Sequence, residues 1–290
     1  MSRGPLRQNE RGVGLVELMI ALVVTSMVIV ATYKTFFGSQ HEALRVTRVV
    51  ERRQNSRASI QLLERELRMA GSGWGRDTIN GKLGATNITL YGIQRGYGGS
   101  LTGNDTIGIL GGWDTKTALR AGKASPGATI RCQSTAGFAV NDFIVVTNEK
   151  RAHLFRATAV SSSPADISVS TSSNYNTSGS LTGWPVGGYV TGDKVYRVSW
   201  VSYKMDTTSF KKRALMRWQA GSAAQVVGYD VSNFRVSYAL QNGTVKRNPT
   251  VAEIQMIDKI VPVVTTLAPG VNNSVAIVDS AWTEVRPRTF

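Results

Sequence analysis

The feature that most constrains this chain is an apolar run near its N-terminus that contains one charged side chain. Between Val13 and Tyr33 the only acidic or basic residue is Glu17. A run of about 20 apolar residues is long enough for a helix to cross a bilayer. A carboxylate at the centre of such a helix costs on the order of 2.5–3.5 kcal/mol, and less near the interface. The sequence therefore predicts a membrane-spanning helix in which Glu17 has a partner for its charge.

The residues on either side of the run indicate how the chain is targeted. Residues 1–12 are short, polar and basic, which is typical of a targeting leader. Residues 31–37, after the run, contain no A-x-A-like cleavage site of an ordinary secretory signal. We therefore expect the apolar helix to be retained in the mature protein. Three basic residues precede the run and three follow soon after it, so the positive-inside rule does not decide its orientation.

The helical pattern continues beyond the apolar run but becomes amphipathic. Residues 40–70 contain no Pro or Gly, and apolar side chains recur there at spacings of three and four. We expect one buried stripe, with the polar face of the helix turned away from the rest of the chain. The expected stripe consists of Val46, Val49, Val50, Ile60, Leu63, Leu67 and Ala70. If the helix continues from Val13 to Ala70 it is about 85 Å long, with Gly38 as a possible bend and Gly71-Ser72-Gly73 as its end.

The remainder of the chain is typical of an antiparallel β structure. Short β-branched runs alternate with segments rich in Gly, Asn, Ser and Thr. Asn242-Gly243 predicts a hairpin between 234–240 and 244–246, and 161–164 and 170–183 are expected to be loops. The other expected strands are Thr86–Tyr91, 106–110, Phe143–Thr147, 153–160, 194–205, 214–218 and 260–267. The expected fold class is α+β, with a long N-terminal helix packed against an antiparallel β-rich head.

The spacing of Gly12 and Glu17 around Val13, followed by an unbroken apolar helix, resembles the leader of type IV prepilins. The resemblance implies cleavage by prepilin peptidase between Gly12 and Val13 and N-methylation of Val13. Glu17 then becomes the fifth residue of the mature chain. Val13 and Gly14 depart from the Phe and Thr that are usual at the first two mature positions. The implied domains are a leader (1–12), a transmembrane and assembly helix (13–34), an amphipathic stalk helix (35–70) and a periplasmic β-rich head (71–290).

A second, looser resemblance concerns the end of the helix and parts of the head. Residues 57–71 look like the end of the stalk helix in PilW-type minor pilins, which also resemble the J-type pseudopilins of type II secretion. Residues 104–107, 196–198 and 231–238 are similar to strand segments of that group. The resemblance implies a type IV pilin-like fold and a role in initiating, or priming, type IV pilus assembly. Two alternatives remain open, a J-type pseudopilin and a membrane-anchored periplasmic adhesin or binding protein.

The same resemblance implies partners and a location. The expected partners are other minor pilins, the major pilin, prepilin peptidase, the inner-membrane assembly platform, and membrane lipid before assembly. The expected location is the bacterial inner membrane, with the N-terminus cytoplasmic and the head periplasmic, and later the pilus or its tip. In a staggered array, the Glu17 carboxylate of one subunit can pair with the Val13 amine of a neighbour and set their register. Alternatively, Glu17 neutralises the Val13 amine of its own chain.

The sequence offers no constellation that indicates an enzyme, a cofactor or a metal centre. His41 and His153 stand apart from any Cys, His or carboxylate cluster with metal-ligand spacing. The Gly-rich stretch at Gly71 follows a helix and is not a dinucleotide-binding motif. Asn104-Asp105 and Gly192-Asp193 are read as turn residues in preference to a calcium site.

Three further features have simple structural interpretations. Cys132 is the only cysteine, which excludes an intramolecular disulfide, and we expect it to be buried. The tryptophans Trp74, Trp113, Trp184 and Trp200 are expected to lie in the core. The formal net charge of +15 is compatible with DNA contact, but a solvated face of the arginine-rich helix is the favoured explanation.

Overall fold

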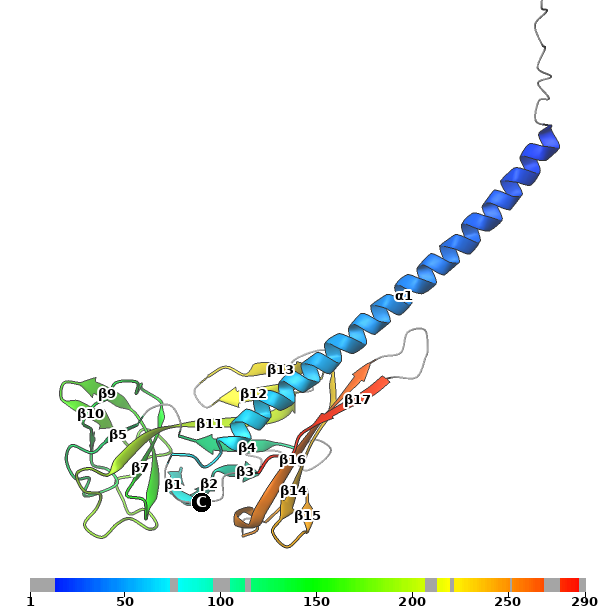
Figure 1. The fold of residues 1–290 in the computed structure, drawn as a ribbon. Helices are drawn as coiled ribbons and strands as arrows, with labels where there is room; N and C mark the ends of the chain where they lie inside the picture. Colours follow the sequence, from blue (N-terminus) through cyan, green and yellow to red (C-terminus); the bar gives the residue numbers. More distant parts are fainter. Residues whose placement is uncertain are drawn as a thin grey trace, which may run out of the picture. The chain divides into compact units, whose positions relative to one another are not determined.

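The computed structural model describes residues 14–73, 78–95, 105–112, 116–206, 213–219, 222–250, 252–268 and 277–286. The chain divides into two compact units, of which the first ends at Glu51 and the second begins at Arg52. One α-helix, α1 (Leu15–Arg68), continues through Gly38 without interruption (Figure 1). The backbone then turns at Gly71, whose φ of 75° suits glycine. The Gly71 N–H donates to the Leu110 carbonyl at 2.8 Å and so fixes the end of the helical segment to a strand.

The expected apolar stripe of the helix is confirmed in its C-terminal part and is wrong in its N-terminal part. Ile60, Leu63, Leu67 and Ala70 are buried against side chains of the sheets. Val46 and Val50, by contrast, are 54% and 45% exposed, and Val49 is half-buried. Val46, Val49 and Val50 belong to the first unit, in which the described residues form no strand.

The expectation that the polar face of the helix is turned away from the head also requires correction. Within the second unit, Arg52 forms an ion pair with Asp230 at 3.2 Å, and Arg53 forms one with Asp279 at 3.0 Å. Ser59 is buried, and its hydroxyl donates to the Val227 carbonyl at 2.8 Å. The helix therefore makes polar contacts with two strands and with the turn at Asp230, in addition to the apolar contacts of the stripe.

Within the described residues the strands form sheets of ten, three and four strands. The first sheet has the order β13-β12-β11-β7-β8-β1-β2, with β3, β4 and β5 paired beside this path. Its strands are β1 (Thr78–Leu83), β2 (Thr86–Tyr91), β3 (Ile93–Arg95), β4 (Ile107–Gly111), β5 (Lys116–Ala118), β7 (Phe143–Thr147), β8 (Ala152–Arg156), β11 (Lys194–Asp206), β12 (Ala214–Gln219) and β13 (Gln225–Tyr229). The small sheet contains β6 (Ile130–Arg131), β10 (Ala165–Ser168) and β9 (Ala159–Ser162) in that order.

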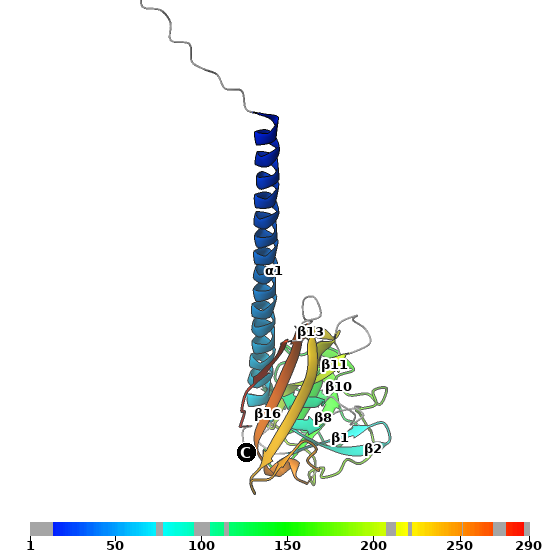
Figure 2. The same ribbon diagram turned by 90° about the vertical axis from the view of Figure 1, so that its right-hand side faces the viewer.

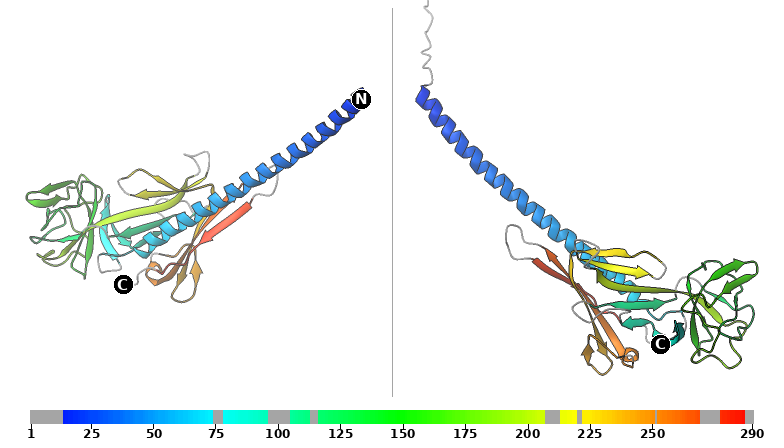
Figure 3. Two further views of the ribbon diagram at one scale, coloured as in Figure 1. Left: turned by 45° about the horizontal axis from the view of Figure 1, so that its top comes forward. Right: turned by 180° about the vertical axis from the view of Figure 1, so that it is seen from behind.

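The long strand β11 connects two parts of the large sheet. Its first residues, up to Val198, pair with β7 and β5, whereas Ser199 to Asp206 pair with β4 and β12. Figures 1 and 3 show β11 extending from the green strands around β7 toward β4 and β12. The pairings of β11 are all antiparallel. Among the described strands of this sheet, one pairing is parallel, a single bridge between Asn80 of β1 and His153 of β8.

The four-stranded sheet has the order β15-β14-β16-β17 and contains the predicted hairpin. Its strands are β14 (Val231–Leu240), β15 (Val245–Lys246), β16 (Ile257–Ala268) and β17 (Ile277–Trp282), with a short 3₁₀ helix η1 (Ile254–Met256) before β16. Figure 2 shows β14 and β16 side by side along their length. Leu240 N–H donates to the Thr244 carbonyl at 2.8 Å, and Gly243 has a φ of 81°. Asn242-Gly243 therefore forms a tight hairpin, as predicted.

Two predicted segments differ from the structure in the elements they contain, and several other predicted strands differ by one to three residues at their ends. The expected strand 153–160 is two strands, β8 and β9, which are separated at Ala157 and Thr158. The expected loop 161–164 is wrong in its first half, because Ser161 and Ser162 belong to β9 and pair with Asp166 and Ala165 of β10. Cross-strand hydrogen bonding thus outweighs the weak strand preference of serine. The stretch 170–183 contains no strand, as predicted.

The core of the second unit consists of three clusters of buried side chains. The first joins the helix residues Ile60, Leu63 and Leu67 to Tyr203 and Phe234 of the sheets. The second includes Cys132, Phe155 and Tyr189, and the third includes Ile79, Phe143 and Trp200. The fold is therefore α+β, with the C-terminal part of a long helix packed on antiparallel sheets.

Candidate functional site

The helix begins immediately after the predicted cleavage position. The Gly14 carbonyl accepts hydrogen bonds from the N–H groups of Glu17 and Leu18, at 2.9 and 3.2 Å. Glu17 thus lies in the first turn of α1, where a negative charge interacts favourably with the helix dipole. Its side chain is exposed, and among the described residues it takes part in no ion pair. Gly12 and Val13 lie outside the described residues.

The N-terminal part of α1 presents apolar side chains in every direction. Residues 14–44 are all exposed, including large side chains such as Leu15, Leu22, Met27 and Ile29. Within the described residues, this is the one helix that is long and apolar enough to cross a membrane, by length and composition. From Leu15 to Tyr33 it extends about 28 Å, close to the thickness of a bilayer core. A helix with apolar side chains on all sides requires lipid or other apolar helices around it.

The hydroxyl groups of this segment are satisfied within the helix. Thr25 donates to the Ala21 carbonyl at 2.7 Å, Ser26 to Val23 at 2.7 Å, and Thr32 to Val28 at 2.8 Å. Because an unpaired polar group in hydrocarbon costs several kcal/mol, these bonds make the segment compatible with lipid. Sequence reasoning had not considered them, although Ser and Thr in an apolar helix are a recognisable signal.

A group of aromatic side chains marks the end of the apolar segment. The rings of Tyr33 and Phe37 are 4.2 Å apart, and Phe36 contacts Phe37 edge-on at 6.0 Å. Lys34, the first basic residue after Val13, lies among them. Exposed aromatic residues beside a lysine are typical of the membrane–water interface. The local geometry therefore favours a membrane boundary close to Tyr33, near the predicted end of the transmembrane segment at 34.

On the second unit, a buried polar cluster holds the C-terminal part of the helix. Glu66 is 7% exposed and accepts hydrogen bonds from the Tyr203 hydroxyl at 2.6 Å and from Arg217 Nε at 2.9 Å. The pKa of Tyr203 is raised, first by burial and then by the Glu66 charge. Sequence reasoning missed Glu66. Its position three residues after Leu63 and four before Ala70 was the available signal, because that spacing places it on the buried face.

The residues considered for metal or catalytic roles have structural roles where the structure describes them. His153 is buried, with Nδ1 at 2.6 Å from the Tyr189 hydroxyl and Nε2 at 3.0 Å from the Thr182 carbonyl, while His41 is exposed. Asp193 accepts a bond from the Val190 N–H within its turn. Asp105 accepts one from Val236 N–H, and Asn104 lies outside the described residues. Over the described parts of the chain, no three His, Cys, Asp or Glu side chains gather as a metal site would require.

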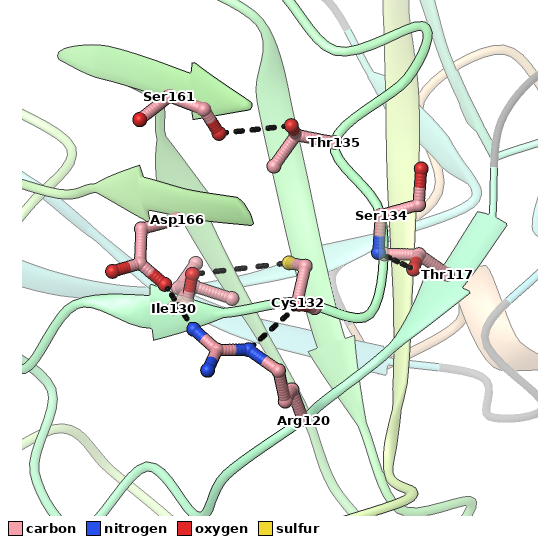
Figure 4. Close-up of polar contacts among 8 residues, drawn as sticks. All are labelled: Thr117, Arg120, Ile130, Cys132, Ser134, Thr135, Ser161 and Asp166. Atoms are coloured by element: carbon pink, nitrogen blue, oxygen red, sulfur yellow. Dashed lines mark hydrogen bonds and ion pairs between the residues drawn. The ribbon is translucent and has the colours of Figure 1, made fainter. Parts of the chain in front are cut away.

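Cys132 is buried, as predicted, and has no disulfide partner. Figure 4 shows its Sγ directed toward the Ile130 carbonyl at 3.8 Å. The Arg120 side chain connects Cys132 to Asp166. Its Nε donates to the Cys132 carbonyl at 3.3 Å, and its Nη2 forms an ion pair with Asp166 at 3.1 Å. Burial raises the pKa of the Cys132 thiol to about 11. The thiol is therefore a core group that is protonated at neutral pH.

The tryptophans give a mixed outcome. Trp200 is buried, as predicted, and Trp184 is partly buried against the second core cluster. Trp74 and Trp113 lie outside the described residues. Trp282, which sequence reasoning did not single out, is exposed on β17.

Comparison with known proteins identifies the N-terminal segment. Residues 7–33 match the family model described as the prokaryotic N-terminal methylation motif, which is the signal of type IV pilins and pseudopilins. Searches of curated proteins and of solved structures gave no significant match. Together with the long apolar N-terminal helix and the antiparallel β-rich region, the motif supports a type IV pilin-like protein. It also supports membrane anchoring and, in general, assembly with other pilins after processing by prepilin peptidase.

Proposed function

We propose that this protein is a minor pilin that takes part in the initiation, or priming, of type IV pilus assembly. The observation that carries the proposal is Glu17, an exposed acid in the first turn of a helix whose other side chains are uncharged over about 28 Å. The sequence resemblance of residues 57–71 to PilW-type minor pilins supports the finer assignment. The mechanism is non-covalent and depends on the bundling of apolar helices.

Processing is the first step of this mechanism. Prepilin peptidase cleaves between Gly12 and Val13, and the new Val13 amine is methylated and positively charged. Glu17 lies four residues further along the chain and can neutralise this amine while the subunit is in lipid. During assembly, the same carboxylate pairs with the Val13 amine of an adjacent subunit. An unpaired charge in hydrocarbon is strongly disfavoured, so the pair fixes the register between neighbouring helices.

The proposed topology places the N-terminus in the cytoplasm and the head in the periplasm. The mature helix remains in the inner membrane until the assembly platform moves it into a pilus or a pilus tip. The proposed partners are the major pilin and other minor pilins. A J-type pseudopilin of type II secretion is the second candidate, because the matched N-terminal motif occurs in both pilins and pseudopilins. Deletion of the gene separates the two, since loss of pili supports the first role and loss of secretion supports the second.

The experiment that tests the proposal is N-terminal sequencing of the protein purified from membranes, together with its intact mass. We expect a mature chain that begins with methylated Val13. The same measurement in a strain without prepilin peptidase should give the uncut chain. A wild-type protein that keeps residues 1–12 in the presence of the peptidase would refute the proposal.

A further inference from the structure

A polar cavity lies at the end of strand β8, between this strand and residues 172–175. Its volume is about 350 Å³, near the lower end of the range for ligand sites of roughly 300–1,000 Å³. Amides, hydroxyls, one aromatic ring and one guanidinium line it, and none of its lining residues is acidic. Its lining includes the side chains of Asn141, Arg156, Ser172 and Tyr175.

The wall of this cavity is held in place by a buried amide. Asn176 Oδ1 accepts a hydrogen bond from the Arg156 N–H at 2.9 Å, and Asn176 Nδ2 donates to the Arg156 carbonyl at 2.8 Å. The same Nδ2 donates to the Ser170 carbonyl at 2.8 Å. The Asn176 amide thus pairs with both backbone groups of Arg156, as the backbone of a neighbouring strand would. Because Asn176 is only 5% exposed, the loop is fixed to β8 and the cavity is preformed.

The guanidinium of Arg156 lies near two aromatic rings. Its central carbon lies 5.8 Å from the Phe143 ring centroid and 6.0 Å from that of Tyr175. These rings attract the positive charge only weakly at such distances and do not accept its in-plane N–H groups. The Nε atom is buried and has no hydrogen-bond partner. Among the described residues, Arg156 takes part in no ion pair.

Because Nε has almost no solvent-accessible surface, a ligand in the cavity can reach only the terminal Nη groups of the guanidinium. The planar guanidinium matches carboxylate and phosphate oxygens and binds them through paired N–H donors. The absence of acidic residues from the lining leaves the charge available for such a ligand. We propose that this cavity binds a small polar ligand through a carboxylate or phosphate group held by Arg156. Asn141 and Ser172 are positioned to contact its remaining polar atoms.

This inference does not depend on the proposed pilus function, and a calorimetric titration tests it directly. The full-length protein in detergent is titrated with inorganic phosphate, with galacturonate, and with neutral galactose, in a buffer without carboxylate or phosphate. We expect saturable binding of at least one of the two anions in the millimolar range or tighter, and weaker binding of galactose. The anion that binds identifies whether phosphate or carboxylate is the preferred group.

Matched variants locate the binding site. Arg156→Met keeps the apolar part of the side chain and should weaken anion binding about tenfold or more, as expected for loss of a charge-assisted pair. Arg131→Met removes one positive charge from an exposed position on β6 and should leave binding unchanged. If Arg156→Met fails to fold, Ser172→Trp provides the test, because it obstructs the cavity from an exposed loop position.

Three results would overturn the proposal. The first is the absence of binding of either anion to the wild-type protein. The second is binding of galactose that is as strong as the binding of the preferred anion. The third is anion binding that Ser172→Trp leaves unchanged, or that Arg131→Met weakens as much as Arg156→Met does.

Discussion

Arg217 contacts a single oxygen of Glu66 through two of its nitrogens, one in a hydrogen bond and one in an ion pair. Nε and Nη2 of Arg217 lie 2.9 and 2.8 Å from Glu66 Oε1, and the Tyr203 hydroxyl donates to Oε2. The exposed fractions of the two side chains are 14% for Arg217 and 9% for Glu66. Since Glu66 belongs to the helix and Arg217 to strand β12, this pair determines how the C-terminal part of the helix is rotated on the sheet.

We predict that Glu66→Ala destabilises the head strongly. The substitution leaves the charge of Arg217 buried and unpaired, which typically costs about 3–5 kcal/mol. The measurement is urea unfolding followed by tryptophan fluorescence. Glu64→Ala is the matched control on the same helix, because the Glu64–Arg68 pair is more exposed and contributes less than about 1 kcal/mol. Equal effects of the two substitutions would contradict the prediction.

The stability of the head should rise with pH on the alkaline side of neutrality because of Lys123. Burial lowers the pKa of this lysine from 10.5 to about 7, although its Nζ donates to the Pro126 and Ala128 carbonyls. Above about pH 7 the unfolded chain therefore binds a proton that the folded chain has lost, and the free energy of unfolding increases with pH. The slope from this group is at most about 1.4 kcal/mol per pH unit.

The increase in the stability of the head with pH has an upper limit. Burial raises the pKa of the Cys132 thiol from 9.0 to about 11 and raises the pKa values of Tyr189 and Tyr203 above 10.0. Above these ordinary values the folded chain retains protons that the unfolded chain loses, so stability falls again. We expect melting temperatures to increase between pH 7 and pH 9 and to decrease above pH 10. In Lys123→Met the increase should disappear and the decrease should remain.

Processing should depend on the small size of Gly12. We predict that Gly12→Lys blocks cleavage, so that the protein from membranes keeps residues 1–12 and its intact mass is larger by that segment. Gly14→Ala is the control, because a Cβ at Gly14 meets no atom within 4 Å. It should be processed normally. Cleavage of Gly12→Lys at the wild-type rate would exclude this position as the peptidase site.

Assembly should depend on the charge of Glu17. We predict that Glu17→Ala inserts into the membrane and is cleaved but is not incorporated into pili or an initiation complex. Insertion itself should improve slightly, since a charge in hydrocarbon costs up to about 2.5–3.5 kcal/mol. Membrane fractionation and electron microscopy of pili measure the two steps. Glu42→Ala, an exposed acid of the same helix that pairs with Arg45, should assemble normally. Normal piliation with Glu17→Ala would argue against the register role.

The thiol of Cys132 should be inert in the folded protein. The thiolate is the reactive form, and a pKa of about 11 leaves very little thiolate at neutral pH. Iodoacetamide is expected to label Cys132 rapidly in urea and negligibly without it, as measured by mass spectrometry. Labelling of the native chain as fast as that of the unfolded chain would show that the thiol is accessible.

Much of the fold could be predicted from local patterns. The bounds of β2 and β7 were predicted as they are, because their apolar and β-branched residues stand between clear turn residues. The strand β1 was missed because its sequence TINGKL is polar and contains Gly81. A Cβ at Gly81 would lie 3.2 Å from Leu154 Cβ, so the glycine permits close approach of β1 to β8. A contact between strands so distant in sequence leaves no local signal.

The candidate site was predictable only in part, for a similar reason. Gly12, Val13 and Glu17 follow from a short linear motif, and their roles in cleavage, methylation and assembly remain predictions. Glu66 was missed because its partners Tyr203 and Arg217 come from strands more than a hundred residues away. Arg156 was missed because its isolation from acids depends on tertiary structure alone.

The hydroxyl groups of Thr25, Ser26 and Thr32 donate hydrogen bonds within their own helix, and this affects the transfer of the subunit from lipid to a bundle of helices. Since each is bonded to its own helix, none of them distinguishes a fatty acyl chain from a neighbouring protein helix. Exchange of one environment for the other therefore breaks none of these hydrogen bonds. Under the proposed function, discrimination between correct and incorrect neighbours is left to the Glu17 carboxylate at the beginning of the helix.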